Sequence, residues 1–454
     1  MHDRLSAFHL RNELRYGGRF LLRENFVCRR RIRRLLEHEL LSVDELSRIT
    51  DAMLLRSLRD AVRRVPAYQA ISVNCGVAEV RDWLRESLPI IGRDDLLSRS
   101  NQLYPYAGKP RPWTIVGKTS GTSGTPLTIF RSADSVLWEQ AFIERHLSWC
   151  GYEPRMHRAH LRGDLVVPVT REVPPLWFYN RYNRQLILSS RHLREPYMAT
   201  ISEAVERFAP YVLQAYPSTA YELASYLERH DQYLNIPYVQ TSSEPLYPRQ
   251  REVIERRLRA RVMDHYGMAE RVAFAGECEH GNLHLNSDYS YVELVDQQGR
   301  PARGEGFIVG TTFHNTVMPL LRYRLSDRTM WRTGTCHCGR PYPMIEPVTG
   351  KYEDAVFGSR GQPISPSVVT FAFKGLAHIK QSQVAQVGDG RWEIRVVPLP
   401  GFGATEYEQL IRNIHRLVDP DLQVQVTQVT EIPRTDSAKY RWIVNESHVA
   451  ESSS

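Results

Sequence analysis

Residues 1–72 place apolar side chains three or four positions apart, and the pattern stops at Pro66, whose ring ends a helix. From residue 89 onward, short apolar runs alternate with amphipathic stretches. Alternating strands and helices predict an α/β fold. The short runs predict strands at 113–116, 165–169, 186–188, 211–214 and 307–309, and the amphipathic stretches predict helices at 133–149, 198–208, 218–230 and 248–258.

A turn-forming stretch at 347–350 separates this large part from about a hundred further residues. The later residues predict a small α+β unit of the ferredoxin-like type, with strands near 384–387, 392–397 and 424–429 and a helix at 405–417. We therefore expect a large domain made of several subdomains, then a small one. The expected parts are an N-terminal helical layer at 1–72, a main body at 73–349, a small domain at 350–450 and a disordered tail at 451–454.

The composition is that of a globular protein. Of the 454 residues, 42% are hydrophobic and 10% aromatic, which excludes a disordered or fibrous chain. No stretch approaches the ~20 uncharged apolar residues of a membrane helix, and residues 1–15 alternate charge with apolar side chains, unlike a signal peptide. We expect a cytoplasmic protein with no membrane partner.

The formal net charge of +8 comes almost entirely from arginine. Such a skew is more typical of coding bias than of a binding surface, and the basic run at 29–34 lies in an amphipathic helical pattern that leaves it solvated. Both features disfavour a nucleic-acid partner. Because lysine is scarce, each lysine within a motif carries more weight; the six are Lys109, Lys118, Lys351, Lys374, Lys380 and Lys439.

The most distinctive local motif is a loop of hydroxyl and glycine residues directly after the apolar run at 113–116. Its backbone N–H groups and hydroxyls can wrap a polyphosphate, whereas the plain alternative is a surface linker. A Walker loop is excluded, because Gly117 and Lys118 would require a glycine five residues before Gly117, where Pro112 stands. The loop residues are Thr119, Ser120, Gly121, Thr122, Ser123 and Gly124.

Seven further segments follow this loop in order. They are Tyr-Pro-Ser at 216–218, Ser-Ser-Glu-Pro at 242–245, Asp-His-Tyr-Gly-Met-Ala-Glu at 264–270, Gly-Glu-Gly at 304–306, Tyr-Arg-Leu-Ser-Asp at 323–327, Gly-Lys-Tyr-Glu-Asp at 350–354 and Pro-Arg-Thr-Asp-Ser-Ala-Lys at 433–439. Together with the loop, this series resembles the adenylate-forming enzymes, the superfamily of acyl-CoA synthetases and nonribosomal adenylation domains. Within it, the chain looks most like the phenylacetate-CoA ligase branch, over residues 55–445.

The resemblance implies an AMP-forming ligase with a mobile small domain. Such an enzyme activates a carboxylic acid with ATP to an acyl-adenylate and releases pyrophosphate. In the family, Tyr266 would stack on adenine, Asp327 would accept hydrogen bonds from the ribose hydroxyls, and Glu270 would hold Mg²⁺. Without the resemblance, Asp327 would be interpreted as one partner of a structural ion pair. The implied nucleotide-binding set is Thr119, Ser120, Gly121, Thr122, Ser123, Gly124, Ser243, Glu244, Pro245, Asp264, Tyr266, Gly267 and Asp327.

The implied catalytic residues are Lys439, Glu270 and Thr122. A cation at Lys439 would stabilise the charge that builds on the α-phosphate once the small domain has closed. Ala438 replaces the glycine of the family motif, a mild departure because alanine still permits close approach. Asp354 falls at the family's hinge between the two domains.

Clustered cysteines predict a second site. Cys336 and Cys338 are separated by one residue and followed by glycine, and Cys278 and His284 lie upstream. Three thiolates and one imidazole form a normal tetrahedral Zn²⁺ set, which would be structural because it leaves no open position. His280 is the alternative fourth ligand; free thiols or one disulfide are the alternatives to a metal.

The acyl pocket of the ligases is built from segments that here contain Phe142, His160, Met268, Val272 and Phe274. Each of these side chains could instead be ordinary core. Arg162 could meet an acidic or hydroxylated substrate, or form a salt bridge with Asp164.

The acceptor of the acyl group stays open at this point. CoA would give a thioester, with an aryl acid among the candidate substrates, whereas an amine or a carrier-protein thiol would give other products. A zinc-stabilised binding protein without catalysis is a third interpretation. A homodimer is also open, since relatives often dimerise.

Overall fold

The structure is a computed structural model of the chain. It describes residues 2–104, 111, 113–118, 127–162, 164, 166–168, 171–193, 196–349, 356–359, 361, 363–364, 369, 372–373, 376, 378–433 and 441–447. The hydroxyl and glycine loop at 119–124, the hinge residue Asp354, Lys439 and the tail at 451–454 lie outside the described residues.

The N-terminal residues form helices, as their apolar spacing predicted. Ser42 caps the third helix by accepting a hydrogen bond from the Glu45 N–H at 3.2 Å, and Pro66 follows Val65, the C-terminal cap of this helix. No helix among the described residues is long and apolar enough to cross a bilayer. The elements are α1 (His2–Arg23), α2 (Phe26–His38), α3 (Val43–Arg64), η1 (Pro66–Tyr68), α4 (Val80–Ser87), α5 (Arg93–Ser98) and α6 (Ser100–Leu103).

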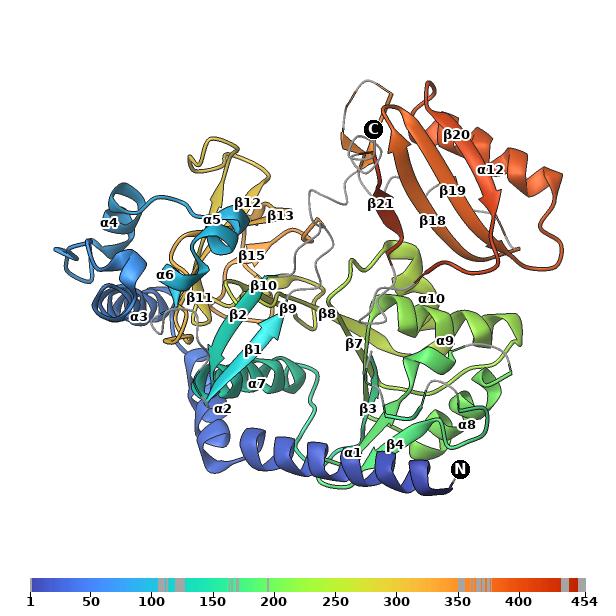
Figure 1. The fold of residues 1–454 in the computed structure, drawn as a ribbon, viewed down its shortest axis with the longest axis horizontal. Coiled ribbons are helices and arrows are strands. Elements are labelled where there is room, and N and C mark those ends of the chain that lie inside the picture. Colours follow the sequence, from blue (N-terminus) through green and yellow to red (C-terminus); the bar gives the residue numbers. More distant parts are fainter. Residues whose placement is uncertain are drawn as a thin grey trace.

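A ten-stranded mixed sheet forms the centre of the large domain (Figure 1). Five neighbouring strands, β5, β3, β6, β7 and β8, run parallel, so their carboxyl ends meet at one edge. In sheet order the strands are β14 (Trp331–Arg332), β15 (Met344–Ile345), β10 (Leu283–Leu285), β9 (Phe274–Glu277), β8 (Arg261–Gly267), β7 (Tyr238–Ser242), β6 (Val212–Ala215), β3 (Arg158–Leu161), β5 (Gln185–Leu188) and β4 (Trp177–Asn180).

Helices cover both faces of this sheet, which explains why its parallel strands are buried runs. One face packs against three helices that follow β5, β6 and β7, and the opposite face packs against the helix before β3 (Figure 1). The three are α8 (Met198–Phe208), α9 (Pro217–Arg229) and α10 (Pro248–Leu258); the single helix is α7 (Ala133–Ser148), and the short η2 spans Ser190–His192.

Two smaller sheets complete the large domain. A hairpin of β1 (Thr114–Lys118) and β2 (Thr128–Ser132) flanks the hydroxyl and glycine loop in the sequence. A three-stranded antiparallel sheet contains β11 (Ser290–Val295), β12 (Gly306–Thr312) and β13 (Tyr323–Thr329), and its apolar side joins the core formed with α3 to α6.

The C-terminal residues form a separate small α+β domain around its own apolar core. Figure 1 shows this domain beside α9 and α10. Its main sheet has the order β20-β19-β18-β21, with an antiparallel central pair and parallel outer pairs. The elements are β16 (Val356–Phe357), β17 (Pro363–Ile364), β18 (Ile379–Gly388), β19 (Arg391–Pro398), α12 (Ala404–Leu417), β20 (Gln423–Gln428) and β21 (Ile443–Asn445). The predicted α/β class, with a large domain and a small one, is confirmed.

The strand expected at 165–169 is wrong for the residues that the structure describes there. Val166 and Val167 are buried but belong to no strand, and the strand in this region is β3, a few residues earlier. Val166 packs with Tyr16 of α1 and accepts a hydrogen bond from Asn12, so its burial comes from the N-terminal helix. Pro168 has no N–H to give to a ladder. The apolar run therefore indicated burial but not strand pairing.

A buried network of charges binds the N-terminal helices to the large domain. The Arg145 side chain on α7 is fully buried and donates to Asp288 Oδ2 at 2.8 Å, and His38 at the end of α2 lies 3.0 Å from the same oxygen. Burial alone would raise the pKa of the Asp288 carboxyl, but Arg145 and His38 hold that pKa well below its usual range. Asp288 is therefore ionised and paired.

We expect Asp288→Asn to lower the free energy of unfolding by about 3–5 kcal/mol, because it leaves the Arg145 guanidinium buried without its main counter-charge. Urea denaturation at neutral pH measures the change. Asp82→Asn is the control: its side chain is 76% exposed beside Arg85, and its loss should cost less than about 0.5 kcal/mol. Equal stabilities of the two variants would contradict this account of the network.

Candidate nucleotide and metal sites

The predicted adenine-rim segment lies at the carboxyl edge of the parallel strands, where ligands bind in open α/β sheets. It follows β7 directly. Ser243 has a φ of 70°, a left-handed backbone conformation that is uncommon outside glycine and asparagine. The Glu244 carboxylate accepts a hydrogen bond from the Ser218 N–H at the start of α9, at 3.1 Å. The Glu244 hydrogen bond therefore joins this turn to the start of α9.

The structure brings together two residues that the sequence places 61 positions apart. The Tyr266 hydroxyl donates to Asp327 Oδ2 at 2.5 Å, joining the end of β8 to the middle of β13. Burial, the Asp327 carboxylate and then Glu270 raise the pKa of Tyr266 well above its usual value. The tyrosine expected at adenine and the aspartate expected at ribose are thus neighbours, and Glu270 is close enough to act on the same hydroxyl.

Arg131 on β2 contacts the segment that carries Glu270. Its guanidinium donates to the Ala269 carbonyl. Burial and the positive charge of Arg271 lower the pKa of Arg131 to about 10, while Glu139 and Glu270 act in the opposite direction. β2, which follows the predicted phosphate loop in the sequence, is therefore joined to the predicted magnesium ligand.

Asp264 lies inside β8 and not at its end. Its Oδ1 accepts a hydrogen bond from Thr241 at 2.6 Å, and its N–H donates to Glu277 Oε2 at 2.9 Å. Burial, followed by the negative charge of Glu277, raises its pKa to about 7, against the effect of the Thr241 hydroxyl. Gly267, three residues on, ends the same strand.

The acyl-pocket candidates fall into two groups. Phe142 of α7 and Phe274 of β9 are fully buried, with ring centroids 6.0 Å apart, and His265 stacks on Phe274 at 5.4 Å. Val272 lies in the main core, where a Cβ at Gly310 would meet its carbonyl oxygen at 2.0 Å. Met268 packs against the same core while half-buried, and His160 lies on β3.

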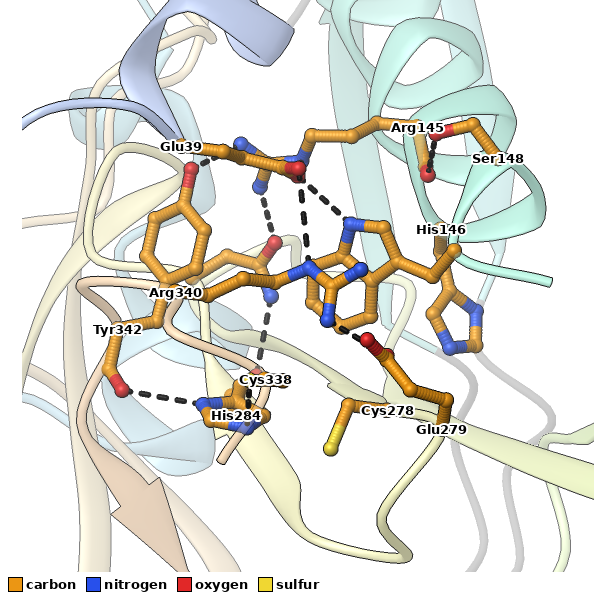
Figure 2. Close-up of polar contacts among 12 residues, drawn as sticks. Glu39, Arg145, His146, Ser148, Cys278, Glu279, His284, Cys338, Arg340 and Tyr342 are labelled. Carbon is orange, nitrogen blue, oxygen red and sulfur yellow. Dashed lines mark hydrogen bonds and ion pairs between the residues drawn. The ribbon is translucent and has the colours of Figure 1, made fainter. Parts of the chain in front are cut away.

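The four predicted zinc ligands converge, and their ligand atoms all lie within 4.8 Å of one another. The Cys278 and Cys336 sulfurs are 3.7 Å apart, close to the ~3.8 Å expected for two thiolates bound 2.3 Å from one tetrahedral zinc ion. The Cys338 sulfur lies 3.3 Å from His284 Nε2. Figure 2 shows Cys278, His284 and Cys338 beside one another. The chemistry and spacing of the donor set fit Zn²⁺.

The surroundings of this cysteine and histidine cluster orient its ligands. His284 Nδ1 donates to the Tyr342 carbonyl at 3.1 Å, which leaves Nε2 toward the sulfurs (Figure 2). His280, the alternative ligand, is exposed and reaches Cys278 through its backbone N–H at 3.4 Å. Burial acts to raise the pKa of the Cys336 thiol. Hydrogen bonds from Cys338 and Asn282 act in the opposite direction, and the net effect lowers this pKa to about 6.

Sequence reasoning missed the residues that join the cluster to the N-terminal helices. Arg340 is two residues after Cys338; it donates to Glu279 at 2.6 Å and lies 3.7 Å from Glu39 (Figure 2). Tyr342 donates to Asp288 at 3.2 Å. In the sequence, only the position of Arg340 and Tyr342 shortly after Cys338 could have indicated this role. The residues that they contact lie far away in the sequence.

The fold is that of solved adenylate-forming acid–CoA ligases. The crystal structure of 2-hydroxyisobutyryl-CoA ligase in the postadenylation state, in complex with R3-HIB-AMP, superposes with a TM-score of 0.70 at 18% identity, covering 91% of this chain and 92% of that one. The anthranilate-CoA ligase AuaEII in complex with anthranoyl-AMP gives a TM-score of 0.51 at 14% identity, covering 88% and 79%.

Sequence comparisons identify one family model and several named relatives. Residues 356–446 match the family model of the CapK C-terminal domain. Protein CapK of Staphylococcus aureus is 23% identical over 242 residues, 53% of this chain and 52% of CapK. Phenylacetate-coenzyme A ligase of Pseudomonas putida is 26% identical over 353 residues, 73% of this chain and 76% of the ligase. The chain thus aligns with about half of CapK and three quarters of the ligase, and the predicted resemblance to the phenylacetate-CoA ligase branch is confirmed.

We expect Asp264 to make stability depend on pH. The native carboxyl keeps its proton to about pH 7, whereas the unfolded one loses it near pH 4, so between these values the native state binds more protons. Stability should therefore fall as pH rises through this window, by up to about 1.4 kcal/mol per pH unit from this group. Asp264→Asn keeps an oxygen for the Thr241 hydroxyl and should flatten that slope.

Urea denaturation of both proteins at several pH values between 4.5 and 7.5 measures the effect. Asp231→Asn, at a side chain that is 87% exposed, should leave the wild-type slope unchanged. An identical slope in Asp264→Asn and the wild type would show that the carboxyl titrates normally.

Proposed function

We propose that this protein uses ATP to activate a carboxylic acid as an acyl-adenylate, releases pyrophosphate and transfers the acyl group to CoA. The observation that supports this most directly is the 2.5 Å hydrogen bond between Tyr266 and Asp327, which joins the expected adenine and ribose partners at the ligand-binding edge of the sheet. The curated relatives named phenylacetate-coenzyme A ligase support the same reaction class.

In this proposal the nucleotide lies beside the carboxyl ends of β7 and β8. The Tyr266 ring stacks on adenine, and the turn formed by Ser243, Glu244 and Pro245 borders the base. Asp327 exchanges its hydrogen bond from Tyr266 for hydrogen bonds from the ribose hydroxyls. Because Glu244 already accepts from the Ser218 N–H, binding requires little rearrangement of the turn.

The phosphates would lie toward Glu270. Its carboxylate is the hard oxygen ligand that Mg²⁺ prefers, and the bound ion would neutralise phosphate charge. An oxygen of the substrate carboxylate attacks the α-phosphorus, the bond to the bridging oxygen breaks, and pyrophosphate leaves. Thr122 and Lys439 are assigned to the charge that develops on the α-phosphate.

Transfer to CoA would follow a rotation of the small domain about Asp354. The domains now meet along a seam where Arg249 donates to the Phe373 carbonyl at 2.9 Å and Tyr247 packs edge-on against Trp442, beside a cavity of about 100 Å³. The TM-score is 0.70 against 2-hydroxyisobutyryl-CoA ligase in the postadenylation state and 0.57 against the same ligase in the thioesterification state. This difference supports a domain arrangement like that of the postadenylation state.

We expect Lys439→Ala to lower carboxylate-dependent exchange of labelled pyrophosphate into ATP by at least about a hundredfold, because one charge-stabilising contact to a transition state is worth this much. Arg412→Ala is the control, since this side chain on α12 is 64% exposed, and it should keep wild-type exchange. A broad panel of acids is needed because the substrate is unidentified.

Wild-type exchange in Lys439→Ala would show that the lysine assignment is wrong. Absence of exchange with every acid, together with no stabilisation by ATP and Mg²⁺, would leave the non-catalytic binding protein as the explanation. Product masses after addition of CoA, amines or a carrier protein distinguish the three acceptors.

We also propose that Cys278, His284, Cys336 and Cys338 hold one structural Zn²⁺. Four protein ligands leave no position for substrate, so the ion would fix the loop between β14 and β15 against the turn between β9 and β10. Through Arg340 and Tyr342, this loop also contacts the network that holds the N-terminal helices.

Protein purified without chelator should contain about one zinc per chain, and the double variant Cys336→Ser with Cys338→Ser should contain less than about a fifth of that, because two of the four ligands are lost. Elemental analysis and the midpoint of thermal unfolding are the two measurements. Cys75→Ser, at an isolated buried cysteine, should keep the metal. A zinc content below about half per chain in the wild type would contradict the proposal.

A further inference from the structure

The first two helices meet at a corner that exposes large apolar side chains. Leu21 and Leu22 lie in the last turn of α1, and Phe26 and Val27 begin α2. Their exposed fractions are 74%, 65%, 77% and 45%. Because the four residues lie within seven positions of the chain, they occupy one small region of the surface. We call these four residues the apolar corner.

The apolar surface continues along α1. Leu10 and Leu14 are 60% and 70% exposed, and their spacing to each other and to Leu21, four and seven positions, puts all three on one side of the helix. The other side of α1 carries the buried Asn12 and Tyr16, which contact the large domain. The exposed leucines are therefore not the side through which α1 joins the fold.

The exposed charges beside this apolar surface are all positive. Among residues 7–36, Glu13 and Glu24 are the acidic ones; both are half-buried, and Glu13 lies 3.3 Å from Arg181. The exposed arginines in the same range are Arg11, Arg29, Arg30, Arg33 and Arg34. The outer side of α1 and α2 thus combines leucine and phenylalanine with arginine.

Other arginines of these helices are used on their inner sides. Arg15 and Arg19 lie 3.0 and 3.8 Å from Asp164, and Arg31 donates to the Asp134 carbonyl at 3.0 Å. These contacts attach α1 and α2 to the large domain. The exposed arginines are additional to the ones that hold the helices in place.

The apolar corner lies far from the seam between the domains. Figure 1 shows α1 along the lower edge of the molecule, with α2 rising from its end, and the small domain at the opposite, upper edge. A large partner bound at the corner would therefore leave the small domain free to rotate.

The chemistry of this surface favours an anionic lipid bilayer as the partner. Contiguous exposed apolar residues mark interaction sites, and helices that lie on membranes combine leucine and phenylalanine with basic residues. A second copy of the chain would bring two arginine-rich surfaces together, which like charges oppose. A nucleic acid would pair with the arginines but leave the apolar corner in water. Only a bilayer offers both phosphates and an apolar layer beneath them.

We propose that α1 and α2 dock on an anionic membrane surface, with the apolar corner inserted at the level of the head groups and Arg29 and Arg30 beside the lipid phosphates. This inference revises the expectation of no membrane partner, which rested on the lack of a spanning segment, because a protein can lie on a bilayer without crossing it. The inference goes beyond the adenylation function and does not depend on it.

Co-sedimentation of the full chain with vesicles tests the inference, using phosphatidylcholine alone or about equal parts of phosphatidylcholine and phosphatidylglycerol. The wild type should bind the anionic vesicles at least about tenfold more tightly than the neutral ones, because several arginines near an anionic surface each add to the affinity. Binding should weaken in about 0.5 M salt, which screens these charges.

Two double variants separate the apolar and the charged contributions. Leu21→Ser with Phe26→Ser should weaken binding to anionic vesicles at least about tenfold, because the burial of two large apolar side chains is lost. Arg29→Gln with Arg30→Gln should also weaken it at least about tenfold, since each arginine near such a surface contributes about a fivefold factor.

Leu417→Ser with Arg412→Gln is the matched control on α12 of the small domain, where the leucine is 39% exposed and the arginine side chain 64% exposed. It should bind like the wild type. A wild type that binds neither kind of vesicle, or binds both equally, overturns the inference, and this result does not depend on the folding of any variant. Wild-type binding by Leu21→Ser with Phe26→Ser also overturns it.

Light scattering without vesicles tests the second copy as the occupant. A wild-type dimer that becomes a monomer in Leu21→Ser with Phe26→Ser, and that does not bind vesicles, would assign the apolar corner to self-association and overturn the inference. Because every measurement here follows binding and not acyl transfer, failure of the membrane inference leaves the adenylation function standing.

Discussion

The pairing of Arg145 with Asp288 is the constraint on which the large domain depends. A guanidinium with no exposure must have a carboxylate beside it, and this one also faces Asn286, Tyr342 and Glu39. These partners come from the end of α2, the segment after β10 and the segment before β15. Satisfying one buried cation therefore fixes the N-terminal helices, an edge of the main sheet and the loop that carries two cysteines in a single arrangement.

Much of the fold followed from local patterns. Helices 198–208 and 248–258 were predicted to the residue, because each has helical apolar spacing and a clear start, such as Pro248 after Tyr247. Strands β18 and β19 were expected from the apolar runs near 384–387 and 392–397. The run at 165–169 misled because α1, and not a neighbouring strand, buries its valines, and a helix packing from 150 residues away leaves no local signal.

The candidate site was predictable where residues stand in ordered motifs and unpredictable where it depends on partners. The motifs placed Tyr266 and Asp327 in one site, and the structure joins them by a hydrogen bond. No spacing rule could decide whether His280 or His284 faces the cysteines, since this depends on the β9–β10 register and on the Tyr342 carbonyl. Likewise, Asp164 is two residues from Arg162, yet two arginines of α1 are its partners.

The seam between the two domains has an energetic consequence. In the described residues the seam includes hydrogen bonds from Arg249 to the Phe373 carbonyl and from Gln381 to Glu222, an edge-on contact of Tyr247 with Trp442, and a cavity, which together give less adhesion than a packed core. Interfaces of this kind are typical of domains that can reorient, and two alternative orientations of such domains differ by only a few kcal/mol. In the proposed reaction, the molecule that fills the space between the domains would therefore select the orientation of the small domain.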